Sequence, residues 1–232
     1  MTGTGEVALA ATSFVATHFL LSHPLRAPLV ARVGERGFLG VYSLVAFGTL
    51  IWTAMAYRAA PAEPQWWPVG DGLWAIGSII MLVASVLLMG SLIRNPAMPH
   101  PEARAVESLP AATGVFAVTR HPMMWAFALW GIAHILVFPD PANIAIASAI
   151  TLLALVGAAL QDRKKAALQP DFWPEWQRRT SYWPFAAIAQ GRARFGGFKP
   201  HALAGGLVIW LVATWAHIPL AGWAAGIWRW LV

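Results

Sequence analysis

The sequence predicts an all-α protein, a polytopic transmembrane bundle of about six helices that forms a single domain over residues 1–232. Hydrophobic residues make up 58% of the 232 residues and charged residues only 11%, whereas a soluble domain carries about 25% charged residues. The hydrophobic residues also gather in runs of about 20, the length that a helix needs to cross about 30 Å of hydrocarbon. These runs are apolar on all sides, which favours helices over barrel strands.

Six runs are long enough to be spans. They cover residues 5–22, 38–57, 73–93, 115–138, 142–161 and 203–218. No basic region precedes the first run, so we expect a retained helix rather than a cleaved signal peptide. Residues 162–200 mix tryptophans with prolines and charges. This mixture is typical of an amphipathic helix at the cytoplasmic membrane surface.

The basic residues predict the orientation. Of the 16 Lys and Arg residues, only Arg58 and Arg229 fall on one side of the predicted spans. Because basic residues gather in cytoplasmic loops, both termini are expected on the periplasmic side of a bacterial inner membrane. The same bias accounts for the net charge of +6, so the lipid bilayer, and no nucleic acid, is the expected surrounding.

Histidines are the candidate metal ligands, because the chain has no cysteine and imidazole binds both transition metals and haem iron. His18 lies within the first run, and His121 and His134 lie within the fourth. Thirteen residues separate His121 from His134, which is about 20 Å along a helix. These two therefore cannot hold one metal together. His18 is either a ligand or a histidine that hydrogen-bonds within the bundle.

The motif Thr119-Arg120-His121-Pro122 opens the fourth run. Ionisable residues at a hydrocarbon boundary are costly and mark functional sites. Arg120 either extends to lipid headgroups or pairs with a carboxylate, such as a haem propionate. Pro122 suits the first turn of a helix, and Trp125 and Trp130 lie further along the same run.

Two stretches resemble the NnrU family of integral membrane proteins, which includes a plastid 15-cis-zeta-carotene isomerase. The first runs from His18 through residues 25–38, and the second covers residues 120–134. Asp162-Arg163 resembles the end of the family's next span. The resemblance implies a haem-binding membrane protein of redox type. It implies either polyene cis–trans isomerisation or a link to nitrogen-oxide respiration, with a hydrophobic substrate or a redox partner, and leaves open whether the chain is an enzyme.

Carried over by position, the resemblance implies haem b held by His18 and His134. Arg120 would neutralise a propionate, and Trp125 and Trp130 would pack against the macrocycle. His121 would line the site. His18 lies near the cytoplasmic end of its span and His134 near the other end of its own, so His121 stays open as the second ligand.

Two alternatives come from other classes. Arg120-His121-Pro122 and the aromatic residues of 168–185 also resemble isoprenylcysteine-type membrane methyltransferases, in which an Arg-His pair binds the carboxylate of S-adenosylmethionine. Lys164-Lys165 and Met124 depart from that pattern, because acidic residues and Tyr are usual there. The third hypothesis is a non-catalytic membrane partner, which predicts no cofactor.

Overall fold

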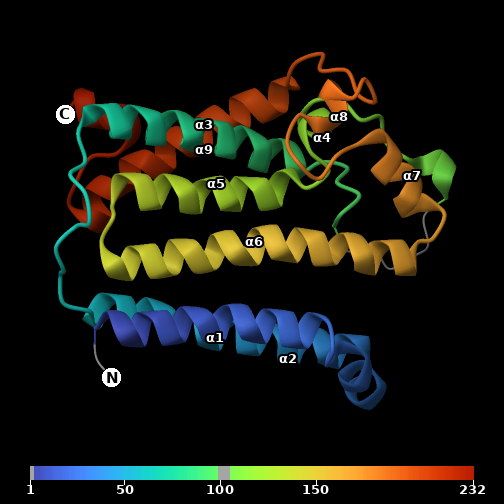
Figure 1. The fold of residues 1–232 in the computed structure, drawn as a ribbon, viewed down its shortest axis with the longest axis horizontal. Helices are drawn as coiled ribbons and strands as arrows, with labels where there is room; N and C mark the ends of the chain where they lie inside the picture. Colours follow the sequence, from blue (N-terminus) through green and yellow to red (C-terminus); the bar gives the residue numbers. More distant parts are fainter. Residues whose placement is uncertain (1–2, 99–104) are drawn as a thin grey trace.

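The structure is a computed structural model that describes residues 3–98 and 105–232, and its long helices run back and forth along one direction (Figure 1). The long helices are α1 (Thr4–Ser22), α2 (Arg26–Ala59), α3 (Asp71–Ser91), α5 (Pro122–Val137), α6 (Pro141–Leu168) and α9 (Pro200–Ala221). The short ones are η1 (Val106–Ser108), α4 (Val115–Val118), α7 (Phe172–Arg179), α8 (Ala186–Ala189) and η2 (Gly226–Trp230). The described residues contain no β-strand, so the all-α prediction is confirmed.

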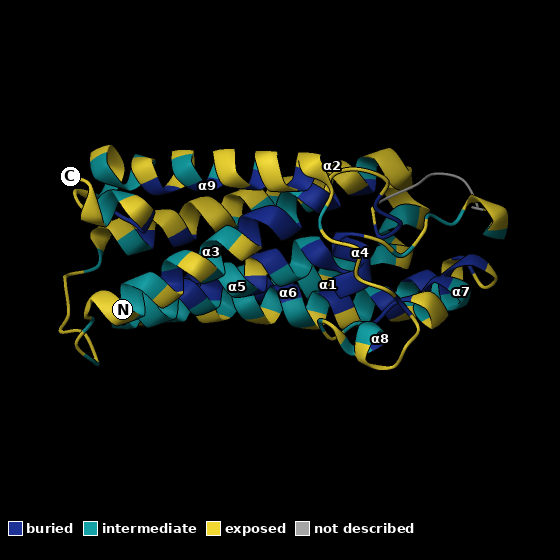
Figure 2. Cartoon of the chain, turned by 90° about the horizontal axis from the view of Figure 1, so that it is seen from above, coloured by how far each residue is buried: buried dark blue, intermediate teal, exposed yellow. Residues whose placement is uncertain are grey.

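Five helices are long and apolar enough to cross a membrane, namely α1, α2, α3, α6 and α9. The chain is therefore a multi-pass membrane protein. Its outer faces carry exposed apolar side chains such as Leu44, Met55, Ile79 and Val208, as expected of surfaces in contact with lipid. Figure 2 shows many exposed residues along α9 and buried residues at α4 and α7.

The prediction of one continuous span over residues 115–138 is wrong. The segment contains the four-residue helix α4, an extended Thr119 with φ −155° and ψ 151°, and the 16-residue helix α5. Pro122 has no amide hydrogen to bond backwards, and its ring disfavours the helical conformation of the residue before it. The helix must therefore begin again at Pro122. At 16 residues, α5 is shorter than the roughly 20 that a full span needs.

The long helices form a layered bundle (Figure 1). α5 packs against both α3 and α6, and α3 also packs against α9. α1 and α2 pair with each other and join the rest mainly through α1 against α6. Both chain ends lie at the same end of the bundle, as the predicted topology requires. The assignment of that end to the periplasm stays a prediction.

The second helix begins earlier than predicted, at Arg26 rather than residue 38, and its first part is joined to the rest across a kink. The kink is at Gly34, whose φ of 71° and ψ of 171° are not helical. Arg26 Nη2 lies 2.9 Å from both carboxylate oxygens of Glu35. This ion pair joins the two sides of the kink.

The predicted surface segment 162–200 is shorter in the structure. α6 continues to Leu168 and α9 begins at Pro200, which leaves α7, α8 and their connections. The amphipathic helix is present as α7, but its aromatic side chains do not face lipid. Phe172, Trp173 and Trp176 are fully buried in one apolar cluster with Phe116 of α4. The protein itself covers the apolar face of α7, and the position of this helix at the membrane surface stays a prediction.

Candidate functional site

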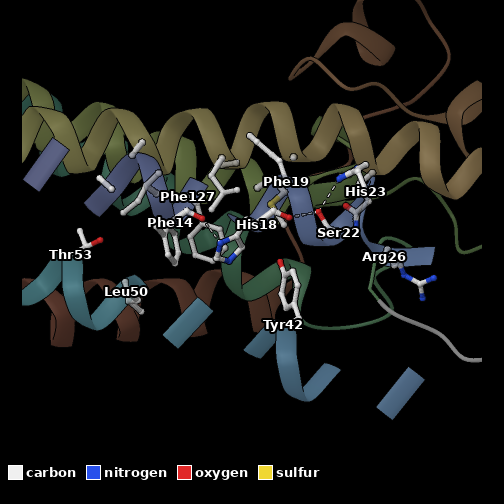
Figure 3. A pocket seen from close by; sticks show the side chains of 18 of the residues that line it. Phe14, His18, Phe19, Ser22, His23, Arg26, Tyr42, Leu50, Thr53 and Phe127 are labelled. Atoms are coloured by element: carbon white, nitrogen blue, oxygen red, sulfur yellow. Dashed lines mark hydrogen bonds between the residues drawn. The ribbon is translucent and has the colours of Figure 1, made fainter. Parts of the chain in front are cut away.

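A cavity of about 780 Å³ lies between α1, α2, α5 and α6. Its volume falls within the range of about 300–1,000 Å³ that is usual for small-molecule sites. Most of its wall is apolar and comes from membrane-spanning helices (Figure 3). The apolar lining includes Phe14, Phe38, Leu50, Phe127, Ile150 and Leu153. The cavity therefore suits an apolar ligand.

His18 is the histidine in the middle of this wall (Figure 3). Its Nδ1 lies 2.7 Å from the carbonyl oxygen of Phe14 in the preceding turn. With Nδ1 donating to that carbonyl, Nε2 carries the lone pair, and no described residue hydrogen-bonds to it. The ring packs against Phe14 at 4.2 Å and edge-on against Tyr42 at 5.4 Å between centroids.

The cavity is polar at one end and reaches the outer surface of the bundle. Ser22, His23, Arg26, Gln161 and Lys164 line the polar end. Leu39, Leu50 and Phe127 line the cavity and are also exposed on the bundle. An apolar molecule dissolved in the bilayer could therefore enter sideways between the helices.

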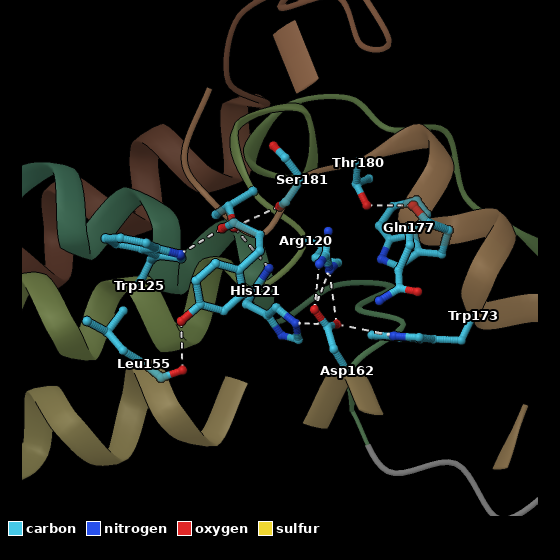
Figure 4. Close-up of polar contacts among 12 residues, drawn as sticks. Arg120, His121, Trp125, Leu155, Asp162, Trp173, Gln177, Thr180 and Ser181 are labelled. Carbon is cyan, nitrogen blue, oxygen red and sulfur yellow. Dashed lines mark hydrogen bonds and ion pairs between the residues drawn. The ribbon is translucent and has the colours of Figure 1, made fainter. Parts of the chain in front are cut away.

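A second site, which is polar, surrounds Asp162 near the end of α6 (Figure 4). Arg120 donates from Nε to both carboxylate oxygens, at 2.9 and 2.8 Å, and His121 Nε2 lies 2.8 Å from Oδ1. Trp173 Nε1 donates to the same oxygen at 3.2 Å. The His121 side chain is 0% exposed and that of Arg120 is 12% exposed. One carboxylate thus joins the start of α5, the end of α6 and the start of α7.

Residues 180–185 dock onto the same motif (Figure 4). Arg120 N donates to Ser181 O at 2.8 Å, and the Thr119 hydroxyl donates to Tyr182 O at 2.8 Å. Trp125 Nε1 donates to Tyr182 O at 2.9 Å. Burial raises the pKa of Tyr182, so its hydroxyl remains a donor to Leu155 O at 2.7 Å. The Arg-His-Pro motif and Trp125 therefore anchor residues 180–185 to the bundle.

This arrangement gives the motif a partner that sequence reasoning missed. Arg120 and His121 both bind Asp162, whereas the methyltransferase alternative needs them to hold a ligand's carboxylate. The sequence carried one signal of this, an aspartate at the end of an otherwise apolar run. It could not show which residues that aspartate would meet 42 positions away.

The structure does not bring the predicted haem ligands together. His18 lines the cavity, but neither His121 nor His134 does. Phe127 is a cavity residue of α5, and His134 lies seven residues further, about 10 Å along the helix. His134 stacks on Trp130 with centroids 4.0 Å apart and lies beside His217 of α9. The ligand pair of His18 and His134 stays a prediction without support from this geometry.

Comparison with known proteins identifies the family. The chain matches the NnrU protein family over residues 6–225. It is 34% identical over 84 residues to the chloroplastic 15-cis-zeta-carotene isomerase of Zea mays, a match that covers 35% of this chain and 22% of that protein. It is 37% identical over 82 residues to the isomerase of the same name from Arabidopsis thaliana, covering 34% and 22%. No solved structure matches the chain. The family match extends over most of the chain, and the protein belongs to the NnrU family.

Proposed function

We propose that this protein binds an extended polyene in the cavity between α1, α2, α5 and α6 and catalyses its cis–trans isomerisation. The observation that carries this proposal is the cavity itself, with about 780 Å³ of apolar space inside membrane-spanning helices. The printed name of the two relatives, 15-cis-zeta-carotene isomerase, supports a polyene as the ligand class. Their matched regions are 22% of their length, so the activity is a proposal for this chain.

A polyene fits the physical requirements of such a site. A ligand that is already dissolved in lipid gains little from leaving water, so packing against the wall must provide most of the binding free energy. A stiff conjugated chain loses little conformational freedom when it binds. The aromatic rings of Phe14, Phe38 and Phe127 offer flat apolar surfaces for this packing. The free Nε2 of His18 and the hydroxyl of Tyr42 are polar groups on residues of the wall.

Haem b, expected from the family resemblance, stays a prediction, because only His18 of its expected ligands lines the cavity. A haem held by His18 and His134 needs both rings on one iron, and the cavity described above contains only the first of them. His18 and His23 both line the cavity, and each has a ring nitrogen without a hydrogen-bond partner among the described residues. No step of the proposed isomerisation is therefore assigned to haem, and a link to nitrogen-oxide respiration also stays a prediction.

The test uses protein purified without removal of bound cofactors and reconstituted in liposomes with 15-cis-zeta-carotene. Binding is followed by quenching of tryptophan fluorescence, and conversion of the cis isomer by chromatography. Leu153→Trp fills the cavity, whereas Leu152→Trp places the same side chain at a position that is exposed outside it. We expect Leu153→Trp to weaken binding about 5- to 150-fold, since overpacking costs about 1–3 kcal/mol, and Leu152→Trp to behave as wild type.

His18→Phe separates binding from isomerisation. The change keeps an aromatic wall and removes the free ring nitrogen, so we expect binding to persist and conversion to slow. A wild-type protein that does not bind the carotene would overturn the proposal. Binding without conversion would reject the isomerase and favour the non-catalytic alternative.

A further inference from the structure

We propose that the polar end of the cavity binds the phosphate of an anionic phospholipid, whose hydrocarbon chain lies in the apolar part. Figure 3 shows Ser22, His23 and Arg26 together at one end of the cavity, and Gln161 and Lys164 of α6 belong to the same lining. The lipid would share the cavity with the polyene, but its binding does not depend on isomerisation. A carotene is a hydrocarbon and has no charged group for this end.

Two basic side chains stand at the polar end. Lys164 lines the cavity, and no described residue forms a hydrogen bond or an ion pair with it. It lies close enough to Arg26 and Glu35 to interact with both charges. Arg26 donates to Glu35 through Nη2, which leaves the hydrogens on its Nε and Nη1 without a partner among the described residues. Glu35 balances only one of the two positive charges, so the group attracts an anion.

Two buried polar atoms at the same end have no partner among the described residues. They are Nε2 of His23 and Oε1 of Gln161. Ser22 Oγ donates its only hydrogen to His18 O, so it accepts from His23 Nδ1 at 2.8 Å. His23 Nε2 then either accepts from a hydroxyl hydrogen or, in the imidazolium form, donates to a charged oxygen. Buried polar atoms are normally hydrogen-bonded, and a head group with charged oxygens and hydroxyl hydrogens would satisfy both.

The apolar part of the cavity continues from this end along one face of α6. Leu153, Gly157, Gln161 and Lys164 all line the cavity and follow one another at spacings of four, four and three residues, which places them on one side of a helix. Leu153 lies eleven residues before Lys164, about 16 Å along the helix axis. One leaflet is about half of the 30 Å hydrocarbon core. The chain of a lipid held at Lys164 therefore reaches the depth of Leu153.

Phosphate suits these donors better than carboxylate does. Arg26 belongs to α2, Lys164 to α6, and His23 follows the end of α1, so the donors approach from different directions. A phosphate group offers three oxygens around one centre, and Arg and Lys both bind it well. α1 ends at Ser22, so the group lies at a span boundary, where lipid phosphates lie. Basic pockets between membrane-spanning helices bind anionic head groups in this way.

The first experiment measures binding of dioleoylphosphatidic acid to the full chain in detergent. Displacement of a fluorescent phosphatidic acid is followed by anisotropy, with dioleoylglycerol and inorganic phosphate as comparison ligands. Dioleoylglycerol has the same chains without the phosphate. We expect phosphatidic acid to bind at least about tenfold more tightly than dioleoylglycerol, as hydrogen bonds to a charged group predict, and inorganic phosphate not to displace the probe. Equal binding of the two lipids would overturn the proposal, as would a free phosphate ion that binds as well as the lipid.

Lys164→Gln tests whether the phosphate binds inside the cavity. Arg163→Gln is its matched control, because Arg163 is exposed and does not line the cavity. We expect phosphatidic acid to bind about tenfold or more weakly to Lys164→Gln and as in wild type to Arg163→Gln. Both variants lose one positive charge, so equal losses would show attraction to a basic surface and would overturn the proposal.

Arg26→Gln is tested beside Glu35→Gln. Both changes break the ion pair that joins the two sides of the kink in α2, but only the first removes a cation. We expect weaker binding of phosphatidic acid to Arg26→Gln and no loss in Glu35→Gln. A loss in both would assign the effect to the kink and would contradict a phosphate contact of Arg26. No carotene is present in these measurements, so their failure is distinguishable from a failure of the proposed function.

Discussion

The Nε2 atom of His121 lies 2.8 Å from a carboxylate oxygen of Asp162, 41 residues further along the chain. Arg120 binds the same carboxylate, and both side chains are nearly shielded from solvent. A buried ion pair contributes little net stability compared with an apolar replacement, but removal of one partner leaves an uncompensated charge. The contacts of Asp162 with Arg120 and His121 therefore hold α5, α6 and α7 in their relative positions.

Asp162→Ala should destabilise the protein strongly. The change leaves the guanidinium of Arg120 buried without its counter-charge, which costs about 3–5 kcal/mol. Thermal unfolding in detergent measures the effect. Glu175→Ala is the matched control, because this carboxylate also pairs with two arginines but on the exposed face of α7. A fall in melting temperature as small as that of the control would show that the contacts of Asp162 do not hold these helices together.

Gly34→Ala should destabilise the kink in α2. A φ of 71° with ψ of 171° is a conformation that only glycine adopts readily, and other residues lose about 1–3 kcal/mol there. Gly40→Ala, in the regular part of the same helix with open space around it, should stabilise by up to about 1 kcal/mol. Chemical denaturation of the two variants compares them directly, and equal stabilities would show that the kink is not required.

Gly206→Ala should separate α9 from α3. A Cβ at Gly206 would lie 2.7 Å from the Cα of Val86 and 2.8 Å from its nitrogen, and backbone atoms cannot move aside without a shift of the helix. Such overpacking costs about 1–3 kcal/mol. At Gly205 the new Cβ would meet the flexible end of Met89 at 2.8 Å, so Gly205→Ala should be tolerated. Melting temperatures of the two single variants test the difference, and the reverse order would contradict this packing.

Thr119→Val should loosen residues 180–185. The Thr119 hydroxyl is fully buried and donates to Tyr182 O at 2.8 Å. Because Trp125 Nε1 still donates to the same carbonyl, the change removes one hydrogen bond and costs about 0.5–1.5 kcal/mol. Faster cleavage of this segment by a protease, followed by mass spectrometry, is the expected result. Thr17→Val serves as control, because that hydroxyl bonds only to carbonyls of its own helix. An unchanged cleavage rate for Thr119→Val would mean that other contacts hold the segment.

Much of the fold could be predicted from the sequence because membrane insertion depends on local composition. An apolar run of about 20 residues must be helical in lipid, where every backbone polar group needs an internal partner. The predicted first helix, residues 5–22, agrees within one residue with the observed Thr4–Ser22. The prediction fails where a local feature interrupts a run, at Pro122, or where a kinked helix continues through basic residues, at Arg26.

The sequence by itself determined the membrane-spanning helices, the family and the importance of Arg120-His121-Pro122. Only the tertiary structure decided the partners of these residues. In the structure, Arg120 and His121 bind Asp162. His18 lines the cavity, and His134 lies beside His217. The physical reason is that helix formation in lipid depends on neighbouring residues, whereas a site depends on which faces of distant helices pack together. The sequence places His18 and His134 on separate helices, and only their packing decides whether the two rings can meet.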